Sequence, residues 1–125
     1  MRFNNFWTYR RILFSRGFAS VVWRSRQNVI ADQQRRPLTA GPYMAELDIT
    51  YQCNCRCRMC QRWKDGRTNE LNLAEYQRLA GMLHEMGSHQ ISIAGGEPLL
   101  REDVFPIIKS FSGLGMSVNL CTNGL

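Results

Sequence analysis

The sequence predicts an α/β fold in which parallel strands alternate with helices. Short segments with the alternation or apolar content of strands lie at 45–50, 90–94 and 116–121. Two longer segments with apolar residues at helical spacing, 72–87 and 102–115, separate them. This order is typical of a parallel sheet with right-handed crossovers, either as an open sheet or as part of a barrel.

Both predicted helices carry signals at their N-terminal ends. Asn72 is the expected N-cap of the first helix, with Glu75 three residues further on. Asp103 is expected to cap the second helix, where Pro106 is tolerated because it falls in the first turn. We therefore expect each helix to begin directly after its cap.

The charge of the chain is concentrated at its N-terminus. Residues 1–42 carry eight arginines and one acidic residue, whereas the remainder is nearly neutral. The segment 35–43 contains two prolines and a glycine and is typical of a linker. We expect a basic, aromatic and helical arm with its linker over 1–42, followed by the α/β unit over 43–125.

The role of this arm has several interpretations. Packing under a barrel, with the arginines in solvent, is favoured. Contact with an anionic membrane surface, a nucleic acid or a partner protein is also open, and an Arg-rich, acid-poor N-terminus further resembles a transit peptide. No run of about eighteen apolar residues occurs, so we expect no membrane-spanning helix.

The five cysteines indicate a metal or cluster site. An odd number cannot pair completely as disulfides, and four of them lie within 53–60. Nothing in the sequence fits a secretory signal. A reducing, cytoplasmic location is therefore expected, because disulfide frameworks belong to exported proteins.

The spacing within this cysteine loop indicates which thiols act together. Cys53, Cys57 and Cys60 follow the pattern C-x3-C-x2-C. Thiolates are the natural ligands of iron–sulfur clusters, and three of them leave one iron of a cubane cluster open to a small molecule. Cys55 lies two residues from both neighbours and is expected to face away as a small buried residue. A structural zinc site using all four thiols fits less well, because such sites join two separated cysteine pairs.

Two further motifs follow the other predicted strands. "GGEP" (95–98) comes after the second strand and "TNG" (122–124) after the third. Either motif alone would fit an ordinary turn. Because the carboxyl ends of parallel strands meet at one edge of a sheet, where ligands gather, we expect both motifs to share a site with the cysteine loop.

Three other residues lie near the ends of the predicted strands, and each has a structural interpretation. Cys121 is expected to be a buried core thiol. Asp48 and Thr50, at the end of the first strand, could point into a barrel, but structural hydrogen bonds are at least as well supported by the pattern.

With C-x3-C-x2-C, "GGEPLLRED" and "CTNG" each after a predicted strand, residues 45–125 resemble the radical S-adenosylmethionine (radical SAM) superfamily. The closest likeness is to the branch of molybdenum-cofactor biosynthesis and peptide-maturase enzymes. The resemblance implies a TIM-type barrel, of which this chain would hold about three strand–helix units. It looks like the N-terminal part of a longer core.

The resemblance also implies the cofactors and their ligands. Cys53, Cys57 and Cys60 would hold a [4Fe–4S] cluster whose open iron binds SAM. Glu97 would either hold its turn or complement an ammonium group, and Met59 would meet the adenine. The residues implied to contact SAM are Met59, Gly95, Gly96, Glu97, Pro98, Thr122 and Asn123.

The implied reaction is reductive cleavage of SAM to a 5′-deoxyadenosyl radical, which abstracts a hydrogen atom from an unknown substrate, a small molecule or a peptide. A reductant such as flavodoxin or ferredoxin would supply the electron. The chain departs from the family pattern at Cys55, where a bulky apolar residue is usual, and at Met59, where an aromatic is frequent. A non-enzymatic iron–sulfur electron-transfer or zinc-binding module is the alternative hypothesis.

Overall fold

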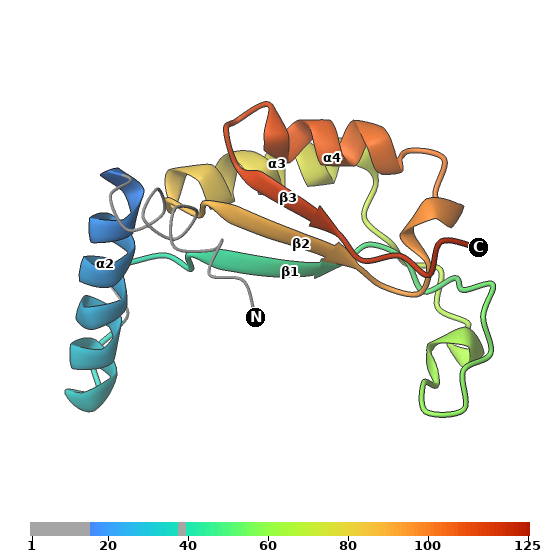
Figure 1. The fold of residues 1–125 in the computed structure, drawn as a ribbon, viewed down its shortest axis with the longest axis horizontal. Coiled ribbons are helices and arrows are strands. Elements are labelled where there is room, and N and C mark those ends of the chain that lie inside the picture. The colour runs from blue at the N-terminus through green and yellow to red at the C-terminus, as the bar shows by residue number, and fades with distance from the viewer. Residues whose placement is uncertain (1–15, 38–39) are drawn as a thin grey trace, which may run out of the picture. The chain divides into compact units, whose positions relative to one another are not determined.

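The computed structural model describes residues 16–37 and 40–125 of the chain. The chain divides into two units, Met1–Gly41 and Pro42–Leu125, which are described separately (Figure 1). The predicted N-terminal arm therefore lies partly outside the described residues, because 1–15 belong to it.

The first unit contains the helix α2, which spans Arg16–Gln33. The segment after this helix folds back along it: the Asn28 side chain donates to Ala40 O at 3.0 Å and accepts from Ala40 N at 3.3 Å. Arg24 adds a bond to Gly41 O. Trp23 is 61% exposed on this helix. No helix in the described ranges is long and apolar enough to cross a membrane.

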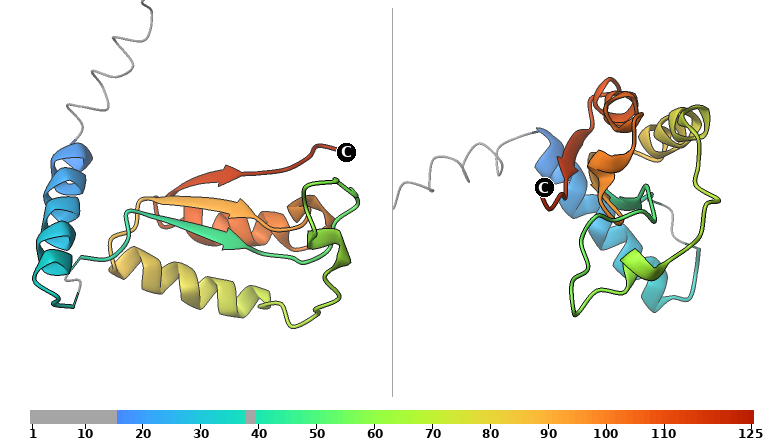
Figure 2. Two further views of the ribbon diagram at one scale, coloured as in Figure 1. Left: turned by 90° about the horizontal axis from the view of Figure 1, so that it is seen from below. Right: turned by 90° about the vertical axis from the view of Figure 1, so that its right-hand side faces the viewer.

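The second unit is the predicted α/β unit. Its three strands are parallel and lie in the order β1-β2-β3, and its two long helices cover the same face of the sheet (Figures 1 and 2). Two single-turn 3-10 helices follow the first and second strands. The elements are β1 Met44–Asp48, η1 Arg62–Lys64, α3 Leu73–Glu85, β2 Gln90–Ala94, η2 Pro98–Leu100, α4 Val104–Ser112 and β3 Ser117–Leu120.

The core lies between the sheet and the two helices. Ile91 and Ile93 of the central strand are fully buried, as are Ile107 and Phe111 of α4. Tyr76 brings the first turn of α3 against them. Burial of these large apolar side chains, each worth about 1.5–3 kcal/mol, fixes the helices on this one face of the sheet.

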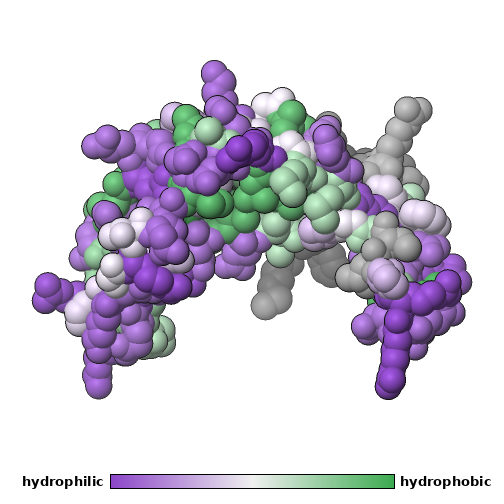
Figure 3. Space-filling model, turned by 180° about the vertical axis from the view of Figure 1, so that it is seen from behind, coloured by the Kyte–Doolittle hydropathy of each residue, from purple (hydrophilic) through white to green (hydrophobic). Residues whose placement is uncertain are grey.

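Apolar residues also reach the surface beside this core. Figure 3 shows apolar residues, coloured green, across the middle of the face seen from behind. Leu47 on β1 and Leu79 on α3 line a pocket between these two elements. The apolar layer therefore continues to the free edge of β1.

The opposite face of the sheet is polar. Glu46, Ser92 and Asn119 are partners in the register of the three strands and so share a face. Neighbouring positions such as Leu47 pack against the core on the other side. Within residues 42–125 no helix covers the polar face (Figure 2).

The helix starts confirm one expectation and correct another. Asn72 and Glu75 form a full capping box, with bonds of 3.1 and 2.8 Å. Asp103 stands at the N-cap of α4, but its side chain makes no capping bond. Its carboxylate is held by Arg101 instead, at 2.8 and 2.9 Å. The predicted position of the cap is therefore confirmed, but the expected capping bond is absent because the guanidinium of Arg101 binds the same oxygens.

Candidate cofactor site

The glycine turn after β2 is fastened to the start of the cysteine loop. Ile49 N donates to Ala94 O at 2.9 Å and continues the pairing of β1 with β2. One residue further on, Gly96 N donates to Thr50 O at 2.8 Å, and Glu97 N donates to Gln52 O at 2.7 Å. The backbone of "GGEP" thus fixes the point from which the cysteine loop departs.

Gly95 and Gly96 are required by this close approach. A Cβ atom at Gly96 would lie 2.0 Å from Gln52 O, and one at Gly95 would lie 2.6 Å from Thr50 O. Gly95 also has φ +139°, which L-residues rarely adopt. The glycines therefore allow the turn to contact the backbone of residues 50–52. They also leave room for the backbone of the turn to approach a ligand closely.

Glu97 connects the glycine turn to "TNG". Its side chain is 1% exposed, and its carboxylate accepts from Thr122 Oγ1 at 2.7 Å, Leu99 N at 3.0 Å and Asn123 N at 2.8 Å. Burial alone would raise the pKa of Glu97, but the hydrogen bonds from Asn123, Thr122 and Leu99 outweigh it and lower the pKa. The buried group is therefore an ionised carboxylate with both oxygens engaged.

Asn123 completes the connection by returning to the cysteine loop. Its side-chain amide donates to Asn54 Oδ1 at 2.9 Å and to Cys55 Sγ at 3.3 Å. The three predicted motifs are therefore joined at the carboxyl edge of the sheet. Asn54 was not singled out by sequence reasoning, because no short-range pattern marks a partner 69 residues away.

Cys55 is half-buried rather than fully buried as expected. Burial raises the pKa of its thiol, and the electrostatic effect of the neighbouring Cys57 and Cys53 side chains raises it further. Its sulfur faces the Asn123 amide. Cys55 is thus the thiol of the loop that contacts the third strand end.

The three spaced cysteines lie on the same exposed loop. Cys53 and Cys60 are half-buried and Cys57 is exposed, and all are free thiols. A turn bond from Cys60 N to Cys57 O at 3.2 Å brings these two positions together. In the described part of the chain, no three His, Cys, Asp or Glu side chains converge closely enough to hold a metal ion. The chemistry of the donor set still fits an iron–sulfur cluster, since thiolates are its usual ligands.

The remaining predicted residues, Pro98, Met59 and Cys121, differ in how far they are exposed. Pro98 is buried at the start of η2. Met59 is 95% exposed and projects into solvent. Cys121, expected in the core, is exposed; its sulfur lies 3.7 Å from Ser92 Oγ. That expectation was wrong because position 121 continues the uncovered polar face of the sheet.

Asp48 and Thr50 both make structural contacts. Asp48 forms an ion pair with Arg62, which lies in η1 after the cysteines. Thr50 is 2% exposed and donates from its hydroxyl to Glu70 Oε1 at 2.9 Å. Thr50 thus makes a structural hydrogen bond, whereas Asp48 shares the uncovered face of the sheet with Glu46, so both interpretations of Asp48 stay open.

Fold and site together define an α/β unit with cysteine thiols and a glycine turn at the carboxyl edge of a parallel sheet. Residues 47–125 match the Radical SAM superfamily. This chain belongs to that superfamily of enzymes, as the three sequence motifs predicted.

Relatives of known name fall in the branch that the motifs indicated. A probable GTP 3′,8-cyclase from Methanothermobacter thermautotrophicus is 32% identical over 99 residues, covering 76% of this chain and 30% of that protein. A probable GTP 3′,8-cyclase from Methanopyrus kandleri is 41% identical over 81 residues, covering 63% and 26%. The PqqA peptide cyclase of a Methylobacterium species is 32% identical over 91 residues, covering 71% and 24%. The chain thus spans less than a third of these relatives.

Proposed function

We propose that residues 43–125 are the N-terminal part of a TIM-type radical SAM core, preceded by a separate arm at 1–42. Cys53, Cys57 and Cys60 hold a [4Fe–4S] cluster, and SAM binds beside the glycine turn. The observation that carries this proposal is the buried Glu97 carboxylate, which joins the glycine turn to "TNG" while the turn itself is bonded to the cysteine loop. A ligand that touches all three motifs needs such fixed spacing.

A bound, reduced cluster would supply the one electron that breaks the S–C5′ bond of SAM, which gives methionine and a 5′-deoxyadenosyl radical able to take a hydrogen atom from the substrate. The protein's own residues position the reactants. The engaged oxygens of Glu97 favour a role in holding the turn over direct contact with an ammonium group. Thr122 and Asn123 would line the substrate side of the turn, and Met59, which is 95% exposed, would cover the adenine.

The substrate is proposed to lie against the polar face of the sheet. Glu46, Ser92 and Asn119 line up across the three strands on that face. Their side chains offer hydrogen-bond donors and acceptors, as a small polar molecule or a peptide backbone requires. Both kinds of substrate fit this proposal, since the relatives are named for GTP and for the PqqA peptide.

The electron is proposed to come from an acidic carrier of the flavodoxin or ferredoxin type. The cysteine loop exposes basic side chains next to its thiols: Arg56 and Lys64 lie over the ring of Trp63 at 5.5 and 5.1 Å, and Arg58 is exposed between Cys57 and Cys60. Charge complementarity of this kind accelerates protein association.

Anaerobic reconstitution tests the proposed function. After incubation with iron and sulfide, addition of SAM and dithionite is expected to yield 5′-deoxyadenosine. Bound zinc without broad visible absorption would instead support the zinc-binding alternative. A cluster that cycles electrons without affecting SAM would support an electron-transfer module.

A further inference from the structure

The cysteine loop has two stems that lie close together. Residues 52–69 leave the sheet after β1 and return before α3, so that 49–51 form the outgoing stem and 70–71 the incoming one. Closing a long loop costs conformational entropy. Contacts between the two stems offset this cost, and they restrict the conformations of the loop that carries the thiols.

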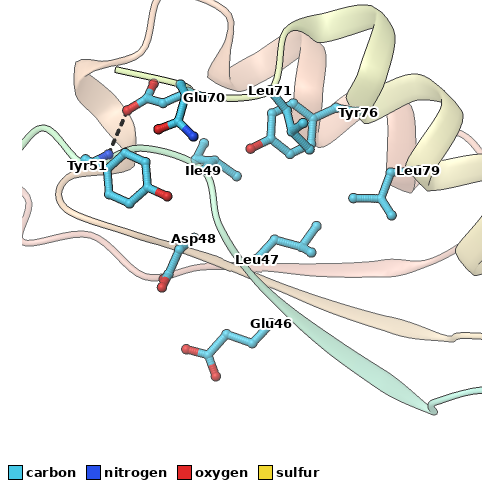
Figure 4. A pocket seen from close by; sticks show the side chains of 10 residues that line it. Glu46, Leu47, Asp48, Ile49, Tyr51, Glu70, Leu71, Tyr76 and Leu79 are labelled. Atoms are coloured by element: carbon cyan, nitrogen blue, oxygen red, sulfur yellow. Dashed lines mark hydrogen bonds between the residues drawn. The ribbon is translucent and has the colours of Figure 1, made fainter. Parts of the chain in front are cut away.

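Glu70 forms the first contact between the stems. Its Oε1 accepts from Tyr51 N at 2.7 Å and from Thr50 Oγ1 at 2.9 Å. Figure 4 shows the bond to Tyr51 and places Glu70 above the end of β1. A carboxylate of the returning chain thus holds the first residues of the departing chain.

Arg101 spans both stems from the segment that follows "GGEP". Its Nη1 donates to Ile49 O at 2.7 Å on the outgoing stem and to Glu70 Oε2 at 3.1 Å on the incoming one. Its Nη2 donates to Leu71 O at 3.1 Å. The Arg101 side chain is only 12% exposed, so water screens these contacts weakly.

Two neighbours fix the orientation of this guanidinium. Asp103 binds it through both carboxylate oxygens, and pairing with Arg101 lowers the pKa of Asp103. The ring of Tyr76 lies 5.5 Å from the guanidinium carbon. The planar fork of arginine can meet a carboxylate and two carbonyls at once, which a lysine ammonium cannot reproduce.

We infer that Arg101 and Glu70 are positioning residues that close the base of the cysteine loop. Their contacts hold the base of the cysteine loop against the segment that follows the glycine turn. The position of the thiols relative to that turn is thereby restricted. This inference rests on the proposed function in one respect, that the loop binds a cluster. The closure of the loop itself does not depend on the cluster.

The first measurement needs no cofactor. Trypsin is applied to wild type, Arg101→Met, Arg101→Lys, Glu70→Gln and the control Arg78→Met, and cleavage after Arg56, Arg58 and Arg62 is followed. Arg78 is exposed on α3 and lies outside the loop and both stems. We expect about tenfold faster cleavage in Arg101→Met and Glu70→Gln, because the free energy of opening the cysteine loop is lower in these variants. Arg101→Lys is expected to recover only part of the resistance to cleavage, and Arg78→Met is expected to match wild type.

The second measurement uses the reconstituted protein. Iron loss to a chelator is expected to be about tenfold faster in Arg101→Met, the range known for residues that support metal ligands. The electron paramagnetic resonance (EPR) signal of its reduced cluster is expected to differ from that of wild type. A merely destabilised fold would lower occupancy without changing that signal.

The outcomes separate the two proposals. If Arg101→Met shows wild-type cleavage, iron retention and EPR signal, the inference is wrong. If it does not fold, Glu70→Gln and Arg101→Lys decide the question by the same criteria. If wild type takes up no cluster, the proposed function fails, while the cleavage rates still decide whether Arg101 and Glu70 close the loop.

Discussion

The buried carboxylate of Glu97 accepts a 2.8 Å hydrogen bond from the backbone amide of Asn123, which lies 26 residues further along the chain. The side-chain amide of Asn123 donates to Asn54 and Cys55 in the cysteine loop. One acidic residue therefore links the ends of the second and third strands, and through Asn123 the first. This link holds the three motifs together at the carboxyl edge of the sheet.

Replacing Glu97 by Gln is expected to destabilise the fold. The amide keeps the shape but loses the charge and one acceptor, so that the buried donors of Thr122 and Asn123 are poorly paired. Loss of charged hydrogen bonds of this kind costs about 1.5–3 kcal/mol in unfolding free energy. Urea unfolding at pH 7 measures it. Glu85→Gln, at an exposed position at the end of α3, is the control and should unfold like wild type.

The same variant has a signature in the pH dependence of stability. Because hydrogen bonds lower the pKa of folded Glu97 below its ordinary value of 4.5, its contribution is fully present above that pH and is lost as pH falls through the folded pKa. The unfolding free energy of wild type should therefore fall more steeply below about pH 4.5 than that of Glu97→Gln. Parallel curves would contradict the assigned role of Glu97.

Gly96→Ala is expected to disrupt the contact between the glycine turn and the cysteine loop. Its Cβ would lie 2.0 Å from Gln52 O, a backbone atom that cannot rotate away. We expect a loss of about 3 kcal/mol in unfolding free energy, measured by thermal or urea unfolding. Gly81→Ala is the matched control, since no atom lies within 4 Å of its Cβ. On a helix this change should stabilise by about 0.5–1 kcal/mol.

The cysteines of the loop are expected to differ sharply in their importance. Cys57→Ala should abolish the reconstituted cluster, because it removes one of three spaced thiolates. Cys55→Ala should leave iron and sulfide content intact, because its sulfur faces the Asn123 amide. Iron, sulfide and visible absorption measure both. A cluster that survives loss of Cys57 but not of Cys55 would overturn the ligand assignment.

Electron delivery from an acidic carrier is expected to depend on the basic loop. Arg58→Glu should slow cluster reduction by flavodoxin about tenfold at low salt, with a smaller effect at high salt, since screening weakens exposed charges. Stopped-flow absorbance follows the reduction. Arg78→Glu, on the exposed side of α3, and reduction by dithionite are the controls. Equal slowing with dithionite would show that the cluster itself had changed.

Local patterns in the sequence predicted the order of strands and helices. The capping box of Asn72 and Glu75 lies within four residues, so that both partners are visible together. The positions of "GGEP" and "TNG" after strands also followed from local pattern and the geometry of parallel sheets.

Long-range partners were not predictable in this way. Glu97 was open to two roles, because its partners at 122 and 123 become neighbours only in the folded sheet. Arg101 lies within the motif "GGEPLLRED", yet no local signal shows that it reaches Ile49 and Glu70. The same guanidinium binds the carboxylate of Asp103, which stands at the N-cap of α4 without making a capping bond. The long-range contacts of Glu97 and Arg101 thus depend on the folded sheet, whereas the pair of Arg101 with Asp103 is local but competes with the capping pattern.

The central claim is that three thiolates leave one iron open for SAM. The most direct test is the EPR spectrum of the reduced, reconstituted chain before and after SAM is added. The account predicts a changed signal with SAM, present in Cys55→Ala and absent in Cys57→Ala. A cluster with an identical signal in the presence of SAM would contradict it.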